Sequence, residues 1–217
     1  MKITALEIIS NDINKAIHFY HEILGFELVA SSPEKAVVKI GHTLFTLKHD
    51  NQAKGVYHLA FDIANNHLEE ALHWIAAKMP VVKDKDHNEI TGFPAWNAKS
   101  FYFYDQEDNL LELITRYDQH SHNSQPFDQH AIIGINEVGI SPAAPLVLAE
   151  DLVSNHGLSW FAKGPKLEEF CVVGDEEGMF VISRAGRNWY PTDKPAGHIP
   201  LRVLVQANGK ESEFSFA

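Results

Sequence analysis

Cysteine is almost absent from this chain. Cys171 is the single cysteine among 217 residues, so no internal disulfide bond can form. Such sparing use of cysteine is typical of proteins in a reducing compartment. We therefore expect a fold stabilised by a buried core, for which a hydrophobic content of 45% is sufficient.

Long hydrophobic runs are also absent. The sequence has no stretch of about 18 apolar residues, the length that a membrane-spanning helix requires. It also has no positively charged segment leading into an apolar one, the pattern of a signal peptide. We therefore expect a cytoplasmic protein that does not have a membrane as a partner.

Positive charge is scarce. Lys and Arg total 18 against 29 Asp and Glu, which gives a formal net charge of -11 at pH 7. Such a chain repels the phosphate backbone of nucleic acids, and no basic cluster offsets this repulsion locally. We expect no nucleic-acid partner. The glycine-rich motifs of nucleotide-binding proteins and the serine-nucleophile motif of hydrolases are missing as well.

A repeated order of elements is what the chain does contain. Residues 1–50 begin with a β-type segment, continue with an amphipathic helix and end with three short β-type runs. The same order recurs over residues 54–118. It resumes over residues 131–217, after a polar segment at 119–130 that is typical of a linker. These patterns predict an α+β fold built from repeated βαβββ modules.

The number of modules predicts how they associate. A single module cannot bury both faces of its sheet, so modules need partners. We expect modules 1–50 and 54–118 to pair into a curved mixed sheet over residues 1–118, forming a cup with the helices outside. The third module, 131–217, then has no partner within the chain. We expect it to pair with its own copy in a homodimer.

Two metal-ligand residue types face the inside of the predicted cup. Period-two alternation places His58, Ala60 and Asp62 on one face of their strand, opposite the apolar face that contacts the helix. The same alternation places Glu112 on the cup face of a later strand. An imidazole and a carboxylate suit Zn, Fe, Ni or Mn, and this pair alone does not choose among them.

The sequence motifs of the second module resemble those of a known superfamily. Residues 57–61 (Tyr-His-Leu-Ala-Phe) open the module, and residues 102–105 (Tyr-Phe-Tyr-Asp) and 110–113 (Leu-Leu-Glu-Leu) close it. With the βαβββ repeats, they resemble the vicinal oxygen chelate superfamily of glyoxalase I, fosfomycin-resistance enzymes, extradiol dioxygenases and bleomycin-binding proteins. The resemblance implies that a first-strand His and a last-strand Glu bind a divalent metal. His58 and Glu112 match those positions.

The repeat is chemically unequal. In the first module, Ala5 and Thr46 occupy the positions that match His58 and Glu112. A catalytic metal usually has three protein ligands and one open position, so a third donor is needed. Glu7 lies two residues after Ala5 on the same strand face. We therefore predict a metal site formed by Glu7, His58 and Glu112.

The rest of the predicted cup is aromatic with a few polar groups. Such a lining suits a small organic ligand, and Lys99 could attract a carboxylate or an enolate. The alternative is that Trp96 plugs the mouth of the cup or packs in the core. The predicted ligand-binding residues are Trp96, Asn97, Lys99, Ser100, Tyr102 and Tyr104.

The third module carries one acidic residue at a comparable position. Glu137 occupies the place in its strand that Ala5 and His58 occupy in theirs. No carboxylate faces it from the strand expected at 201–205, so we interpret this module as structural. Its long loop contains an aromatic segment at 188–190 (Asn-Trp-Tyr). We expect this segment to cover a cup, to contact a second subunit, or to pack on its own sheet.

The resemblance implies a glyoxalase-like or dioxygenase-like protein that binds a small oxygen-rich organic ligand in its cup. One reading is a divalent-metal-dependent lyase, isomerase or dioxygenase, in which the metal acts as a Lewis acid. The other reading is a metal-free protein that binds or sequesters a small molecule, with a hydrogen-bonded His–Glu pair in the cup. The sequence leaves both readings open.

Overall fold

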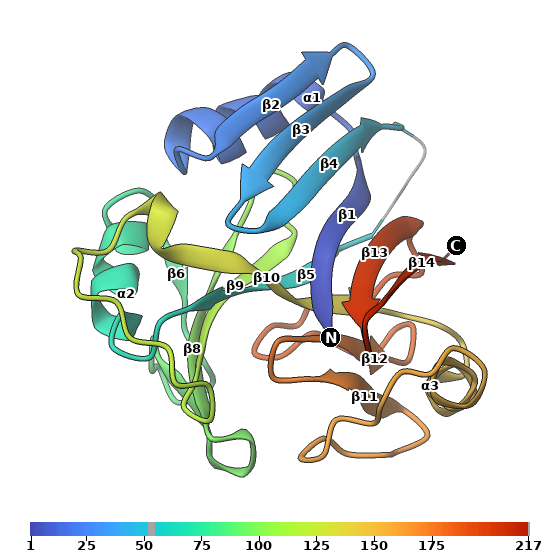
Figure 1. Cartoon of the computed structure of the whole chain (residues 1–217). Coiled ribbons are helices and arrows are strands. Elements are labelled where there is room, and N and C mark those ends of the chain that lie inside the picture. The colour runs from blue at the N-terminus through green and yellow to red at the C-terminus, as the bar shows by residue number, and fades with distance from the viewer. Residues whose placement is uncertain (52–54, 217) are drawn as a thin grey trace.

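The computed structural model describes residues 1–51 and 55–216 (Figure 1). The first module contains β1 (Lys2–Ser10), α1 (Ile13–Ile17), the π-helical turn η1 (His18–Ile23), β2 (Glu27–Ser32), β3 (Lys35–Ile40) and β4 (Thr43–His49). The second contains β5 (His58–Ile63), α2 (Leu68–Ala76), β6 (Val81–Val82), β7 (Thr91–Phe93), η2 (Pro94–Trp96), β8 (Ala98–Tyr104) and β9 (Leu110–Arg116). The remainder contains η3 (Gln129–Ala131), β10 (Ile132–Ile140), α3 (Pro145–Ser154), β11 (Phe170–Asp175), β12 (Gly178–Ser183), β13 (Leu201–Ala207) and β14 (Lys210–Phe216).

The α+β class and the repeated modules are confirmed. The strands form a 6-stranded sheet in the order β14-β13-β1-β4-β3-β2 and an 8-stranded sheet in the order β11-β12-β10-β5-β9-β8-β6, in which β7 also pairs with β8. In each module the first strand lies parallel to a later one: β1 to β4, β5 to β9 and β10 to β12. None of the helices in the described residues is long and apolar enough to cross a membrane.

The predicted pairing of modules 1–50 and 54–118 within one sheet is corrected by this topology. The second module pairs with the third, because β5 lies antiparallel to β10, with Leu59 opposite Val138. The first strand of the chain instead has β13 as its antiparallel neighbour. The alternation of polar and apolar residues indicates which face of a strand is buried. It does not specify which other strand pairs with its free edge.

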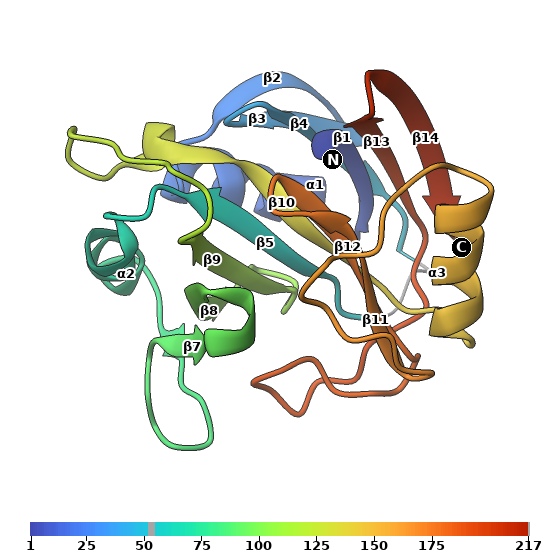
Figure 2. The same ribbon diagram turned by 60° about the horizontal axis from the view of Figure 1, so that its bottom comes forward.

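The end of the chain also departs from the expected arrangement. β12 lies beside β10 and β11 beside β12, while the hairpin β13–β14 crosses to the other sheet, where β13 lies next to β1 (Figure 1). The strand expected to complete the third module therefore completes the sheet of the first. A second view shows α2 and α3 on opposite sides of the molecule, with β5, β10 and β12 between them (Figure 2).

The apolar faces of the two sheets share one core. It includes Phe45 and Leu47 from β4, Phe61 from β5 and Val138 from β10, all of which are buried. The ring of Phe26, just before β2, meets the ring of Phe61 edge-on at 6.4 Å between centroids. The opposite face of the 8-stranded sheet remains free to form the cup.

The turn between β3 and β4 approaches β10 very closely. Gly41 has a φ of 55°, and a Cβ there would lie 2.0 Å from the carbonyl oxygen of Ile133, so only glycine fits. The buried hydroxyl of Thr43 donates to the carbonyl of Ile3 at 2.9 Å and accepts from the backbone N–H of Ile135 at 3.1 Å. One side chain thus fastens β10 to the first module.

Asp62 is a buried carboxyl group on the cup side of β5. Its Oδ1 atom has no hydrogen-bond partner among the described residues. Burial raises the pKa of Asp62 to about 7, and the charge of Arg116 offsets part of this effect. The ionised form is therefore poorly accommodated in the folded protein.

We predict that Thr43→Val lowers the free energy of unfolding by about 2 kcal/mol, because the buried N–H of Ile135 loses its acceptor while side-chain shape is retained. Chemical denaturation of both proteins measures this difference. Thr46→Val, on the half-buried face of the same strand, serves as the control and should change stability by less than about 0.5 kcal/mol. Equal effects of the two substitutions would contradict the bridging role of Thr43.

We predict that Asp62→Asn stabilises the protein more at pH 8 than at pH 5. An unfolded aspartate titrates at about 3.9, so the wild type loses stability as the pH rises from about 4 to about 7 and then levels off. The asparagine variant lacks this loss, and its advantage should be about 2 kcal/mol larger at pH 8. Denaturation at both pH values tests this, and an advantage independent of pH would contradict it.

Candidate metal centre

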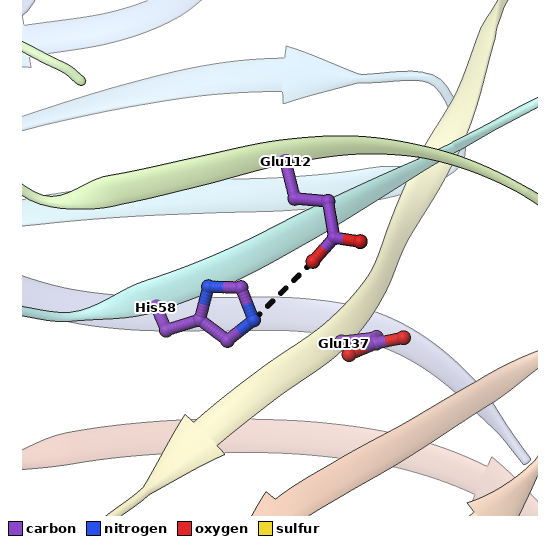
Figure 3. A group of neighbouring side chains, drawn as sticks. All are labelled: His58, Glu112 and Glu137. Atoms are coloured by element: carbon purple, nitrogen blue, oxygen red, sulfur yellow. Dashed lines mark ion pairs between the residues drawn. The ribbon is translucent and has the colours of Figure 1, made fainter. Parts of the chain in front are cut away.

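Three buried side chains from three adjacent strands converge in the cup. His58 lies on β5, Glu112 on β9 and Glu137 on β10, and one candidate ligand atom from each lies within 4.8 Å of the other two. Because β5 is hydrogen-bonded to β9 on one side and to β10 on the other, it lies between the two carboxylates. Figure 3 shows His58 and Glu112 pointing toward each other, with the carboxyl group of Glu137 beside them.

The imidazole of His58 is oriented by the backbone. Its Nδ1 lies 3.2 Å from the carbonyl oxygen of Leu110, and its Nε2 lies 3.4 Å from Oε2 of Glu112 (Figure 3). Burial lowers the pKa of His58 to about 4, so the ring is neutral at physiological pH. Nδ1–H then donates to Leu110, and the lone pair of Nε2 points into the cup. Histidine ligands of metals are usually oriented in this way.

Glu112 faces His58 from a desolvated position. Burial raises the pKa of Glu112 to about 8, and the negative charge of Glu137 contributes to this rise. A neutral Nε2 and an ionised carboxylate are both acceptors, so neither can satisfy the other without a shared proton or a cation. The residues present therefore fit a divalent metal, with three protein donors and room for an exogenous ligand.

Glu137 is held by a buried arginine. Arg116 lies at the end of β9 with no exposed surface, and its Nη2 donates to Oε1 of Glu137. Its Nε donates to Oδ1 of Asn136 at 2.8 Å, which fixes the plane of the guanidinium group. Burial raises the pKa of Glu137, and Arg116 partly offsets this rise. The arginine thus fixes one oxygen of Glu137, while the carboxylate still faces the cup.

A cavity of about 110 Å³ lies over these donors. The ring of Trp189, in the loop between β12 and β13, covers His58 at 5.1 Å between centroids, and its Nε1 donates to the carbonyl of Val56 at 3.3 Å. A Cβ at Gly139 would lie 2.8 Å from the Trp189 ring, so this glycine makes room for the cover. The cavity is lined by His58, Phe93, Trp96, Tyr102, Glu112, Ile114, Glu137, Phe170, Val181, Arg187, Trp189 and Tyr190.

Glu7 is not part of this group. It lies on β1 in the 6-stranded sheet, where its neighbour on β13 is Arg202. The predicted grouping of Glu7 with His58 and Glu112 does not form, because β5 pairs with β10 and not with β1. Glu137 of β10 occupies the third place in the cluster.

Three of the predicted ligand-binding residues lie at the cup. Trp96 and Tyr102 line the cavity, and Ser100 is buried on the same face of β8 as Tyr102. Trp96 also packs edge-on against Phe161, with 5.2 Å between the ring centroids. The role of these residues as ligand contacts stays a prediction.

The other three predicted ligand-binding residues have different surroundings. The side-chain amide of Asn97 donates to Oδ1 of Asp118 at 2.9 Å. Lys99 is exposed on the face of β8 opposite the cup. Tyr104 lies under the ammonium group of Lys194, which is 4.6 Å from the centre of its ring. None of the three lines the cavity over the cluster.

Sequence reasoning did not assign Glu137, Arg116 and Trp189 to the site. A signal existed for Glu137, since it matches the strand position of His58. The segment 201–205, from which a partner carboxylate is expected, belongs to the other sheet. The sequence carried no signal for Arg116, and the segment containing Trp189 had three open interpretations.

A family model of the Glyoxalase/Bleomycin resistance protein/Dioxygenase superfamily matches residues 2–162. The chain is 30% identical over 113 residues to metallothiol transferase FosB of Staphylococcus epidermidis, covering 48% of this chain and 75% of that protein. It is 28% identical over 111 residues to FosB of Staphylococcus haemolyticus, covering 48% and 76%.

A solved structure shares most of the fold. The "putative dioxygenase" from Bacillus subtilis covers 90% of this chain and 68% of its own, with a TM-score of 0.60 and 16% sequence identity. At this identity the likeness concerns the fold alone. The match over residues 2–162 spans most of the chain, which therefore belongs to the Glyoxalase/Bleomycin resistance protein/Dioxygenase superfamily.

Proposed function

We propose that this protein is a metal-dependent enzyme acting on a small oxygen-rich organic molecule. His58, Glu112 and Glu137 would hold the divalent ion. The observation that carries the proposal is the convergence of these three buried donors within 4.8 Å, on three strands of one sheet. When bound, the ion supplies Lewis-acid stabilisation of negative charge that develops on a ligand oxygen.

The surrounding residues prepare the donors and exclude water. The carbonyl of Leu110 holds the His58 ring so that Nε2 faces the cup. Arg116 restrains Glu137 through a charge-assisted hydrogen bond. Trp189 covers the imidazole, and its hydrogen bond to Val56 fixes the angle of the cover. A site with restrained donors and little water favours electrostatic catalysis, because the groups need not reorganise during the reaction.

The donor set narrows the reaction class. It has one imidazole and two carboxylates, whereas non-heme iron oxygenases typically use two imidazoles and one carboxylate. We therefore place lyase, isomerase or transferase chemistry ahead of dioxygenase chemistry. The relatives named metallothiol transferase support metal dependence and add thiol transfer to these classes.

A metal-free binding protein is the second candidate, and one observation favours it. The guanidinium group of Arg116 already places a positive charge beside Glu137. A carboxyl group of Glu112 that kept its proton could donate to Nε2 of His58, so the cluster could be satisfied by protons alone. In that case the cup would bind its ligand without dependence on a divalent ion.

We predict that the wild type binds one Mn²⁺ or Zn²⁺ per chain and that Glu112→Gln weakens this binding at least about 100-fold. The substitution removes a charged ligand, and removal of groups that merely support ligands already costs about 10- to 100-fold. Isothermal titration calorimetry measures the affinity. Glu137→Gln should weaken binding as well.

Glu7→Gln is the matched control, because it removes a carboxylate of the other sheet. It should leave the affinity unchanged within about twofold, well below the loss expected for a ligand. A wild type that binds neither these ions nor Fe²⁺ or Ni²⁺ would refute the metal-dependent enzyme. Ligand-induced thermal stabilisation that survives a chelator would then support the metal-free binding protein.

A further inference from the structure

The wall of the cup contains an arginine that forms no ion pair with a carboxylate in the described part of the chain. Arg187 lines the cavity above the donor cluster. The other arginines, Arg116, Arg184 and Arg202, each pair with a glutamate. No ion pair of Arg187 occurs within residues 1–51 and 55–216. In a chain with a net charge of -11, an arginine left without a carboxylate at a cavity is available to an anionic ligand.

The backbone around Arg187 is well fixed. Its carbonyl accepts from the N–H of Ala196 at 2.8 Å, and the N–H of Gly186 donates to the carbonyl of Ala196 at 2.8 Å. Two residues further on, the N–H of Trp189 donates to the carbonyl of Lys194 at 2.9 Å. These bonds make a short hairpin of the loop, which contains both Trp189, the residue that covers His58, and Arg187, the cation at the cavity.

The side chain of Arg187 is also held, although not by charge. Its guanidinium carbon lies 4.7 Å from the centre of the Phe170 ring, and its Nη1 contacts the hydroxyl of Ser183 at 3.4 Å. A guanidinium group supported by a ring keeps most of its donors free. Its planar pair of N–H groups matches the two oxygens of a carboxylate.

An outer depression continues from this point. Arg187 and Tyr190 line both the inner cavity and a second hollow of about 480 Å³, which also contains Lys85, Asn188 and Thr192. The inner end therefore offers the three proposed metal ligands, and the outer end offers positive charge and hydrogen-bond donors. A ligand that spans both ends would meet the proposed metal site at one end and positive charge at the other, so an acidic group suits its outer end.

The walls between the two ends are aromatic and largely apolar. Phe93 lies between Trp96 and Tyr190, with ring centroids 6.3 Å and 6.1 Å away. Aromatic faces of this kind pack well against a planar ligand. The lining thus favours a flat molecule over a bulky saturated one.

We propose that Arg187 binds the carboxylate of the substrate, and that the substrate class is a small, flat organic acid whose other end reaches the space between His58, Glu112 and Glu137. The assignment of the inner end rests on the proposed function, whereas the carboxylate contact of Arg187 does not. Arg187 is then the residue that selects acids over neutral analogues.

The test uses a matched pair of probes on the Mn²⁺-loaded protein. 3,4-Dihydroxybenzoate and 3,4-dihydroxybenzamide have nearly the same shape and differ in charge. Calorimetry should show the wild type binding the acid about tenfold more tightly than the amide, the effect of one charge-assisted contact. In Arg187→Gln the acid should lose this advantage while the affinity for the amide stays unchanged. Arg184→Gln is the control, since Arg184 is exposed in the same loop and pairs with Glu169.

Several results would overturn the proposal. These are equal affinities of the wild type for acid and amide, no binding of either probe, or an equal loss for both probes in Arg187→Gln, which would indicate a merely structural role. Titration of Mn²⁺ alone separates this proposal from the metal site. A protein that binds no Mn²⁺ yet prefers the acid through Arg187 would refute the metal-dependent enzyme and support the carboxylate contact. A protein that binds Mn²⁺ without preferring the acid would refute the carboxylate contact and support the metal site.

Discussion

The antiparallel pairing of β5 with β10 is the contact on which the candidate site depends. It sets Glu137 opposite Ala60, and Ala60 is in turn the neighbour of Glu112 on β9. Three donors that are far apart in the sequence are thereby brought to one face of one sheet. The first module also contacts β10, through the close approach of Gly41 and the hydrogen bond of Thr43.

The candidate site places charged side chains in a buried environment. Two carboxylates and a guanidinium group lie where water is excluded, and each is costly to bury alone. Arg116 forms an ion pair with Glu137 and relieves this cost, whereas the ion-pair partner of Glu112 is the neutral imidazole of His58. The cluster is therefore asymmetric, with Glu137 paired to a cation and Glu112 stabilised by a proton that a divalent ion could replace. Because of this asymmetry, the cluster is suited to binding a positive ion and contributes little to stability as a purely structural element.

Much of the fold was predictable, and the reasons are local. Alternation and helical spacing located the modules, and they placed His58 and Glu112 on the inner face of the second one. Strand pairing was not predictable, because the edges of β1 and β10 carry no residue pattern that distinguishes them as partners for β5. Glu7 and Glu137 were thus equivalent candidates from alternation alone, and the topology selects Glu137. The roles of Arg116 and Arg187 could not be predicted for the same reason, because contacts between distant segments create the surroundings of both side chains.

The path of the hairpin β13–β14 has a consequence for how the chain folds during synthesis. Leu6 of β1 pairs with Val203 of β13, so the first strand to be synthesised pairs with one of the last. β5, β9, β10 and β12 are complete before that point, which lets the cup assemble while the edge of β1 is still open. An open strand edge invites pairing with other chains, and contacts this distant in sequence form slowly. The order of synthesis therefore protects the candidate site first and leaves the first module as the stretch most exposed to misassociation on the ribosome.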